Sequence, residues 1–308
     1  MDISVQIAGI RLEHPVMNAA GTCRYLQDVI KLKNSAAAAV MIGSITWEAR
    51  EGNAGEVYWA GPMYSLNSLG LPNPGAAWYE SALPEMAKVV HGEGKPLFVS
   101  VAGFSPTEYA KLAALAFEGG ADLVELNLGC PNVWGSGGQK PIASFNTELV
   151  NKILEETEGA VGTSAAVSAK VSPFSNPLDL QSLAGVFDCS LLIKVVTTSN
   201  TFPNAFDFNE LGQPRITPAE GFAGFAGLAM KPIGLGQVRQ WRKVLPERIQ
   251  IIGVGGVASQ QDVRDYLASD ADAVQIATAY LGSGTPRPQV FSEILTGMLP
   301  FDEDSVPF

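Results

Sequence analysis

The stretch ADLVELNLGCPN, residues 121–132, passes from an apolar run into a turn of small and polar residues. A continuous apolar run that ends in such residues is typical of a buried strand in a parallel sheet. The strand is expected to end near Asn127. Cys130 then lies on the turn that follows it, between a glycine and a proline.

Seven further runs have the same character, which makes eight in all. They are residues 15–21, 38–46, 96–103, 166–173, 191–200, 249–256 and 273–279. Amphipathic stretches lie between most of them. Eight strand–helix units predict an α/β fold, a closed (β/α)₈ barrel with long loops at the C-terminal face, as one domain over residues 1–308. A doubly wound open sheet is the main alternative.

Two of the intervening stretches carry clear helix signals. Residues 105–121 begin with Ser105 as N-cap and Glu108 completing a capping box, and glycines 119 and 120 end the pattern. Their apolar face holds Tyr109, Leu112, Ala113 and Ala116. A second helix is expected after Ser259, with Val263, Tyr266 and Leu267 on one face.

Composition restricts the possible functions. The chain has 308 residues, of which 46% are hydrophobic and 17% charged, as in globular proteins. Its net charge of −11 opposes binding to nucleic acid or anionic membranes. The N-terminus does not resemble a signal peptide, and no apolar run has the length of a membrane span. Three widely spaced cysteines and two histidines predict no disulfide framework, no metal site and a cytoplasmic location.

Polar side chains recur where the predicted strands end, and barrel enzymes carry their active sites there. These residues are Ser100, Asn127, Cys130, Lys170, Asn200 and Thr278. Two connections, about residues 51–73 and 202–227, are long enough to carry function or an interface. Trp59, in the first connection, is expected to be exposed and would suit a dimer interface.

The glycine-rich segment 253–258 follows a predicted strand and precedes a helix. It fits the loose GxGxxA dinucleotide pattern, but the next strand ends without the acidic residue that would hold a ribose. Gly255 and Gly256, between the last two strands, instead predict backbone N–H groups that bind a phosphate. A turn without a ligand is the alternative. For residues 221–227, a mobile loop, a phosphate contact and a packing turn remain open.

Cys130 differs from the other two thiols by its position. Cys23 and Cys189 are expected to be small buried hydrophobic residues. Cys130 instead precedes a glycine-rich loop that is suited to act as a lid. Neither His14 nor His91 lies at a strand end to serve as its base, which argues against acyl chemistry. Proton abstraction from carbon remains as the role of the thiol.

Amides and one lysine complete the candidate site. Four asparagines near strand ends are suited to orient a polar planar ligand. These are Asn67, Asn127, Asn132 and Asn200. Lys170 lies in an otherwise apolar strand, so it must be paired or face a ligand. It is expected either to stabilise an anionic cofactor ring or to form an ion pair with Glu125.

Together these motifs resemble the class 1A dihydroorotate dehydrogenases, flavin enzymes of pyrimidine biosynthesis. The resemblance runs from about Val16 to Gly297 and rests on MNAAG, REGN, NSLGLPN, SVAG, ELNLGCPN, AKVSP, SNTFPN, GFAGFAG, MKP, IIGVGG and QIATA. It implies an FMN-containing (β/α)₈ barrel, usually a homodimer. It also implies oxidation of dihydroorotate to orotate, with fumarate as the electron acceptor.

The resemblance implies roles for individual residues as well. Cys130 would take a proton from C5 while a hydride passes from C6 to the flavin, and Lys170 would lie beside the flavin ring. The implied substrate contacts are Asn67, Leu69, Gly70, Leu71, Asn127, Asn132, Asn200 and Thr201. The implied FMN contacts are Ala19, Ala20, Gly21, Ser44, Ser100, Asn127, Lys170, Ser199, Gly227, Gly255, Gly256, Ala277 and Thr278.

The chain departs from the family pattern at several positions. Gly43 replaces a lysine usual at the end of the second strand, Gly129 replaces a serine before the cysteine, and Ala20 replaces a frequent serine. The loop around residues 134–139 is longer. The lost cation suggests, as an alternative, an FMN oxidoreductase with another pyrimidine-like or unsaturated substrate. A flavin- or phosphate-binding barrel without catalysis is a third hypothesis, and the retained base argues against it.

Overall fold

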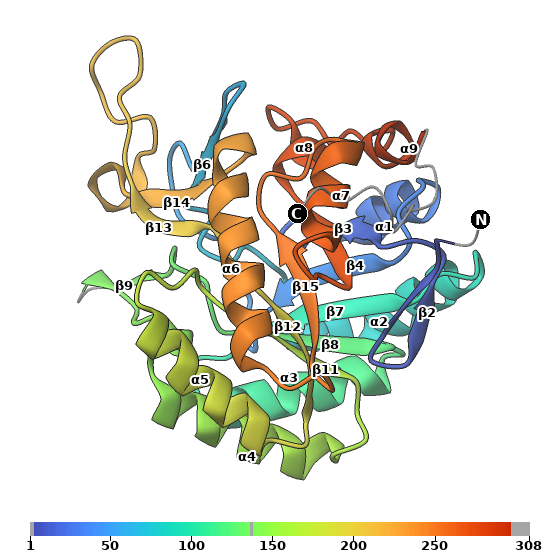
Figure 1. Ribbon diagram of the computed structural model, residues 1–308. Coiled ribbons are helices and arrows are strands. Elements are labelled where there is room, and N and C mark those ends of the chain that lie inside the picture. The colour runs from blue at the N-terminus through green and yellow to red at the C-terminus, as the bar shows by residue number, and fades with distance from the viewer. Residues whose placement is uncertain (1–2, 136–137, 297–308) are drawn as a thin grey trace.

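The computed structural model describes residues 3–135 and 138–296 and is built around eight parallel strands (Figure 1). Their order is β3-β16-β15-β12-β11-β8-β7-β4. They are β3 (Val16–Asn18), β4 (Val40–Ile45), β7 (Leu97–Val101), β8 (Leu123–Asn127), β11 (Val167–Lys170), β12 (Ile193–Thr197), β15 (Gln250–Val254) and β16 (Ala273–Ile276). Each lies within one of the eight apolar runs. The (β/α)₈ prediction is therefore confirmed, and the open-sheet alternative is wrong.

The two end strands of this order, β3 and β4, meet through a side chain. The fully buried Asn18 amide accepts a hydrogen bond from the Met41 N–H at 2.8 Å and donates to the Met41 carbonyl at 2.8 Å. The Ala38 N–H donates to the Val16 carbonyl at 2.9 Å. These bonds satisfy backbone groups that a regular strand ladder would pair, and they bring the barrel close to closure.

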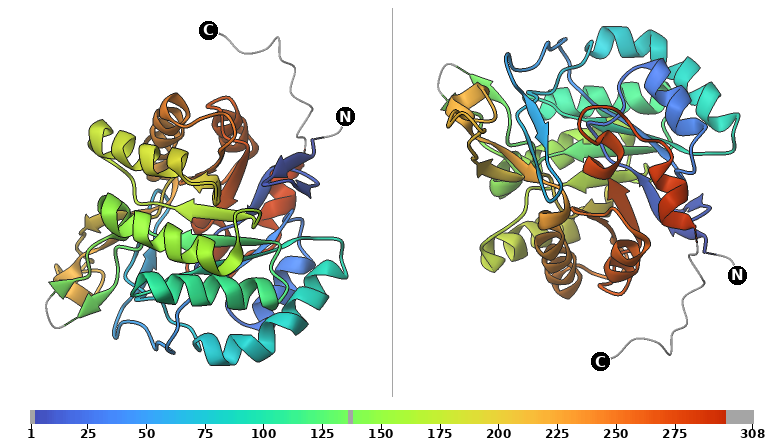
Figure 2. Two further views of the ribbon diagram at one scale, coloured as in Figure 1. Left: turned by 90° about the horizontal axis from the view of Figure 1, so that it is seen from below. Right: turned by 90° about the horizontal axis from the view of Figure 1, so that it is seen from above.

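Helices lie outside the barrel strands, as the views from below and from above show (Figure 2). They are α1 (Leu26–Lys33), α2 (Ala76–His91), α3 (Pro106–Glu118), α4 (Thr147–Val161), α5 (Pro177–Cys189), α6 (Lys231–Val244), α7 (Gln260–Leu267), α8 (Thr278–Leu281) and α9 (Val290–Leu295). The prediction of one domain over residues 1–308 stays a prediction. It includes residues 1–2, 136–137 and 297–308, which lie outside the described residues.

Successive residues of each barrel strand pack on opposite faces. In β4, Val40 and Ile42 belong to the cluster shared with the helices, whereas Met41 belongs to a second cluster with Phe98. This alternation is the pattern of strands buried on both faces. The hairpin of β1 (Val5–Ile7) and β2 (Ile10–Leu12) adds two fully buried side chains, Ile7 and Leu12, to the second cluster, near the N-terminal ends of the strands. The opposite end is left for polar groups.

The predicted helix caps are confirmed in the main. The Ser105 hydroxyl accepts a hydrogen bond from the Glu108 N–H at 3.2 Å, and Ser259 forms a complete capping box with Asp262. The capping box predicted for Ser105 is only half right. The Glu108 carboxylate reaches one residue further back and accepts from the Phe104 N–H at 2.6 Å. Leu267, predicted on the buried face of α7, is only partly buried.

The two long connections pair with each other above the C-terminal ends of the barrel strands (Figure 1). Their strands form a sheet in the order β13-β14-β6-β5, called here the four-stranded sheet. They are β5 (Tyr58–Ala60), β6 (Ser65–Asn67), β13 (Phe202–Ala205) and β14 (Ala223–Ala226). Residues 221–227 are therefore largely a paired strand and not a mobile loop. Trp59, predicted to be exposed, is partly buried, because the Arg215 guanidinium lies 4.2 Å from the centre of its ring.

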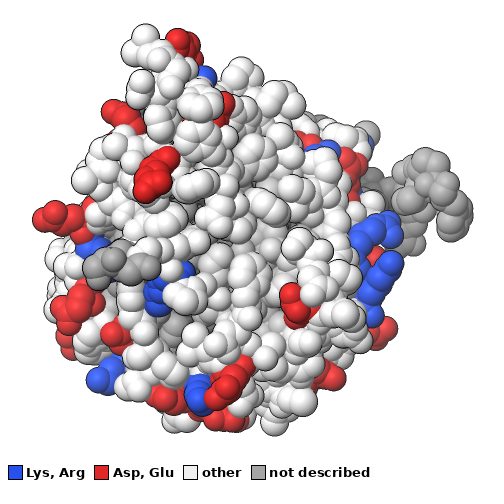
Figure 3. All heavy atoms as spheres, turned by 90° about the vertical axis from the view of Figure 1, so that its left-hand side faces the viewer, with Lys and Arg blue, Asp and Glu red and all other residues white. Residues whose placement is uncertain are grey.

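The surface agrees with the acidic composition. On the face in Figure 3, acidic and basic side chains are dispersed, and its described part shows no continuous basic stripe. Within residues 3–135 and 138–296, none of the helices has the length and apolar character needed to cross a membrane.

Candidate active site

Two adjoining cavities lie between the barrel strand ends and the four-stranded sheet. The larger measures about 430 Å³ and the smaller about 120 Å³. Gly255 and Gly256 line only the larger, called here the glycine-lined cavity, and Cys130 lines only the smaller, called the thiol-lined cavity. The two adjoin because they share lining residues: Ala20, Lys170, Asn200, Thr201, Ala226, Ala277 and Thr278.

The remaining predicted site residues, except Ser100, divide between the two cavities. The glycine-lined cavity also has Ala19, Ser199 and Gly227. The thiol-lined cavity also has Gly21, Ser44, Asn67, Leu69, Gly70, Leu71, Asn127 and Asn132. Ser100 lines neither cavity. It is fully buried, and its hydroxyl lies 2.9 Å from that of Ser44, so it supports a lining residue and does not face the space itself.

Glycine is required where the turn after β15 meets the start of α6. Gly256 has φ +71°, and a Cβ there would lie 2.7 Å from the Lys231 backbone nitrogen and 2.9 Å from the Leu228 carbonyl oxygen. Gly227, which directly precedes Leu228, has φ +89°. Side chains rarely tolerate this backbone region, and none would fit the space at Gly256. The wall of the cavity is therefore main chain at this point.

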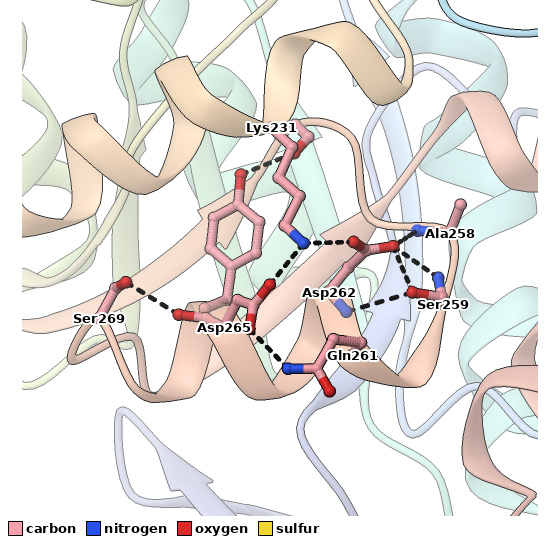
Figure 4. A network of polar contacts seen from close by, with 9 residues as sticks. Lys231, Ala258, Ser259, Gln261, Asp262, Asp265 and Ser269 are labelled. Carbon is pink, nitrogen blue, oxygen red and sulfur yellow. Dashed lines mark hydrogen bonds and ion pairs between the residues drawn. The ribbon is translucent and has the colours of Figure 1, made fainter. Parts of the chain in front are cut away.

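Lys231 does not supply a free charge to this wall. Its ammonium group lies 2.6 Å from Asp262 and also contacts Asp265, as Figure 4 shows. The same Asp262 accepts hydrogen bonds from the N–H groups of Ala258 at 3.0 Å and Ser259 at 2.8 Å. The network ties the start of α6 to the start of α7 and fixes the turn between them.

Two other cations among the described residues line the glycine-lined cavity, but Arg287 is paired with Glu293 at 3.1 Å and Lys170 donates to Gln275. An anion at the glycine turn would therefore depend mainly on backbone N–H groups.

Asparagine amides form the polar wall of the thiol-lined cavity. Asn132 donates to the Asn67 side chain at 2.8 Å, and Asn200 donates to the Asn127 side chain at 3.1 Å. Asn127 also donates to the Ser44 hydroxyl at 2.8 Å. Each pair of amides comes from different loops and strands, and the mutual bonds set their directions. The set can present both donors and acceptors to a planar ligand.

Cys130 lies partly buried three residues after the end of β8. Burial raises the pKa of its thiol, and the Asn132 N–H together with the cations Lys140, Arg50 and Lys170 opposes that rise. Lys140 and Arg50 were not predicted. They are held near the loop because both lie against Phe104, at 3.9 Å and 4.9 Å from the ring centre.

Of the other two thiols, both predicted to be buried, only one is. Cys23 is fully buried, as expected. Cys189 is exposed, so the prediction of a buried thiol is wrong there. It is the last residue of α5, where the chain leaves the packed face of the helix.

Lys170, at the end of β11, is buried and faces both cavities. Burial lowers the pKa of its ammonium group, while Glu125 and Cys130 oppose the change. The predicted alternative of a direct ion pair with Glu125 is wrong. Lys170 donates to the Gln275 side chain at 3.1 Å, and Gln275 donates to Glu125 at 3.0 Å. A glutamine inside the apolar run 273–279 was the signal for this bridge.

The structure adds lining residues that the sequence did not reveal. Arg24, Tyr58 and Ser65 line the thiol-lined cavity, and the Ser65 hydroxyl lies 3.0 Å from that of Thr278. They come from segments whose proximity depends on the tertiary fold. Among the described residues, no group of three or more His, Cys, Asp or Glu side chains is arranged to hold a metal ion.

Known proteins share both the sequence and the fold. The family model described as Dihydroorotate dehydrogenase matches residues 2–299. A putative dihydroorotate dehydrogenase A (fumarate) from Streptococcus uberis is 34% identical, over 94% of this chain and 90% of that protein. Dihydroorotate dehydrogenase A (fumarate) from Lactococcus lactis subsp. cremoris (strain MG1363) is 32% identical, over 95% of this chain and 92% of that protein.

A solved structure shows the same fold at lower sequence identity. It is the crystal structure of DHODH from Eimeria tenella in complex with ferulenol, which superimposes with a TM-score of 0.81 at 16% identity. The match covers 97% of this chain and 84% of that chain. From its sequence and its barrel, the chain belongs to the dihydroorotate dehydrogenase family and is an oxidoreductase that acts on a CH–CH bond.

Proposed function

We propose that this protein oxidises dihydroorotate to orotate in pyrimidine biosynthesis, with FMN as cofactor and fumarate as electron acceptor. The observation that carries the proposal is the position of Cys130, beside four asparagine amides and next to a cavity with a glycine turn. The names of relatives that are 32–34% identical support the substrate and the acceptor. They favour dihydroorotate over another pyrimidine-like compound.

The glycine-lined cavity fits FMN by its size and its polar groups. Its volume of about 430 Å³ lies within the range of cofactor sites. Thr201 borders both cavities, and its hydroxyl is buried close to Gly224 without a hydrogen-bond partner among the described residues. Buried polar groups are normally paired, so an unpaired hydroxyl on a lining residue is consistent with a ligand at this site. Bound FMN supplies the acceptor for a hydride.

The residues that would hold FMN follow from the walls of the cavities. Gly227, Gly255 and Gly256 provide backbone at the phosphate end, and Lys170 provides a cation beside the ring. The other proposed contacts are Ala19, Ala20, Gly21, Ser44, Asn127, Ser199, Ala277 and Thr278. Ser100 acts by orienting the Ser44 hydroxyl.

The substrate ring would lie in the thiol-lined cavity. Dihydroorotate has ring N–H and carbonyl groups, and the amides of Asn67, Asn127, Asn132 and Asn200 offer matching partners. Thr201 and the backbone of residues 69–71 complete this wall. Because the amides bond to one another before the ligand arrives, the site is preorganised for a planar ring.

Cys130 acts as the general base in this proposal. Its thiolate takes the proton from C5, and the loss of a hydride from C6 then leaves the double bond of orotate between these carbons. Burial raises the pKa of Cys130, which strengthens the thiolate as a base but lowers its population at neutral pH. Lys140, Arg50 and Lys170 oppose the rise in pKa and so raise the fraction of Cys130 that is thiolate.

Location and assembly are further parts of the proposal. Free thiols and an acidic composition support a cytoplasmic protein. The family resemblance supports a homodimer, and sedimentation of the purified protein measures its mass directly.

Anaerobic mixing of the purified flavoprotein with dihydroorotate tests the activity. Rapid loss of oxidised-flavin absorbance, followed by its recovery on addition of fumarate, is the expected result. A flavin that stays oxidised with dihydroorotate but is reduced by another cyclic amide would replace the proposed substrate. A flavin that no such compound reduces would contradict the proposed reaction.

A further inference from the structure

Two charged side chains line the thiol-lined cavity within the described part of the chain, Lys170 and Arg24. Lys170 is already engaged by Gln275 and also borders the glycine-lined cavity. Arg24 borders the thiol-lined cavity alone. Arg24 is therefore positioned to bind an anionic ligand beside Cys130 and not the phosphate of a cofactor.

The Arg24 guanidinium is largely free to bind a ligand. Its single hydrogen bond goes from Nη2 to the Gly21 carbonyl at 3.3 Å, and it has no carboxylate partner within 4.0 Å among residues 3–135 and 138–296. Asp28 is close in sequence, but its carboxylate accepts from the backbone N–H groups of Arg24 and Tyr25 at 3.2 and 3.1 Å. A guanidinium has five N–H donors, so most of them remain available.

The backbone holds Arg24 in place without help from its side chain. Gly21 donates to the Gly43 carbonyl at 2.6 Å, and Gly43 donates to the Cys23 carbonyl at 2.9 Å. The Tyr79 hydroxyl donates to the Arg24 carbonyl at 3.0 Å. Replacing the side chain therefore leaves these anchoring bonds intact.

Gly43 explains why the charge comes from this loop. A Cβ at Gly43 would lie 2.3 Å from the Ser100 carbonyl oxygen, and its φ of +108° disfavours any side chain. Gly43 directly precedes the lining residue Ser44 and, without a side chain, contributes no charge to the site. Cys23 pairs with Gly43, and the next residue, Arg24, contributes the positive charge instead.

We propose that Arg24 binds the carboxylate of dihydroorotate and orotate and selects them over dihydropyrimidines that lack this group. The proposal rests on the function proposed above. Amides satisfy ring N–H and carbonyl groups, but a carboxylate taken out of water needs a cation. A guanidinium binds a carboxylate through two parallel hydrogen bonds. Fumarate also has carboxylates, so the same group serves the electron acceptor.

The test compares orotate with uracil, which lacks the carboxylate, on flavin-loaded Arg24→Met and wild-type protein. Binding is followed by calorimetry and by the change in the flavin spectrum. Orotate should bind the variant roughly 10- to 100-fold more weakly, the scale of a lost charged hydrogen bond. The affinity for uracil, the flavin content and the melting temperature should not change. Arg24→Lys should recover part of the orotate affinity, and exposed Arg248→Met is the matched control.

The outcomes separate this inference from the proposed function. If dihydroorotate reduces both proteins and Arg24→Met binds orotate as tightly as wild type, the inference is wrong and the function stands. An equal loss of orotate and uracil affinity also contradicts it, because the carboxylate would not be the group recognised. If dihydroorotate neither binds nor reduces the wild-type flavoprotein, the proposed function itself fails, and the role of Arg24 fails with it.

Discussion

The two cavities share a wall but are built from different chemical groups. The glycine-lined cavity is shaped by main chain at Gly227, Gly255 and Gly256, and the nearby Lys231 is neutralised by two aspartates. The thiol-lined cavity is built mainly from side chains: a thiol, amides, the Arg24 guanidinium and the Lys170 ammonium group, which also borders the glycine-lined cavity. Cofactor binding should therefore depend on backbone conformation, whereas substrate chemistry should depend on a few functional groups. Substitutions can separate the two properties.

The largest expected effect is on the rate of chemistry. Cys130→Ala should slow flavin reduction by dihydroorotate on the order of 10²-fold or more, because the proposed general base is lost. The flavin content should stay at the wild-type level, since Cys130 does not border the glycine-lined cavity. Stopped-flow absorbance measures the rate, and the exposed Cys189→Ala is the control. Loss of flavin from the Cys130 variant would contradict the separation of the two cavities.

The next effect is on cofactor affinity. Gly256→Ala forces a side chain into the φ +71° position and against the Lys231 backbone. A strain of about 1–3 kcal/mol would weaken FMN binding roughly 5- to 150-fold. Equilibrium dialysis of FMN measures it. Gly236→Ala, in α6 with no atom within 4 Å of the new Cβ, should bind FMN normally. Unchanged FMN affinity of Gly256→Ala would show that main-chain approach is not what forms the site.

A smaller effect is expected for one amide. Asn132→Ala removes the hydrogen bond to Asn67 and one ring partner. The loss of about 0.5–1.5 kcal/mol would weaken orotate binding by roughly 2- to 10-fold, with FMN affinity unchanged. Titration of orotate into the flavoprotein measures the change in affinity. Asn151→Ala, at an exposed position of α4, is the matched control. A loss of FMN together with orotate would mean that the amides also shape the cofactor cavity.

The smallest effect is a shift in pH dependence. The proposed base Cys130 must be deprotonated to act, and burial raises its pKa, so flavin reduction should accelerate as pH rises and level off only above that pKa. Lys140→Met removes a cation that opposes the rise, so the profile should move to higher pH with its plateau unchanged. Reduction rates across pH measure it, and Lys152→Met, exposed on α4, should leave the profile in place. A shift to lower pH would contradict the assigned role of Lys140.

Sequence periodicity was sufficient for the barrel because each strand is a local pattern. The apolar runs placed all eight barrel strands, and residues at their ends meet at one face because parallel strands share a direction. Family resemblance supplied the individual roles of the amides. The strand at 223–226 was not predicted, because its partner at 65–67 is remote in sequence.

The contacts that were missed are tertiary in origin. No pattern in the sequence distinguishes Arg24 from a surface arginine, and its place beside the cavity follows from the bridge between Cys23 and Gly43. The alternative interpretation of Lys170, an ion pair with Glu125, named the wrong partner for a related reason. A buried lysine needs compensation, but the choice between Glu125 and Gln275 depends on side-chain reach within the barrel.

The four-stranded sheet also bears on the order of folding. Its central ladder aligns Asn67 with Gly224, which are 157 positions apart, so most of the barrel must assemble before these strands can meet. During synthesis, the edge of β6 that pairs with β14 stays unpaired until β14 has left the ribosome. An unpaired strand edge is prone to association with other chains. The cavities lie between this sheet and the barrel. A cofactor bound there would contact both parts, stabilise the paired sheet, and raise the temperature of unfolding.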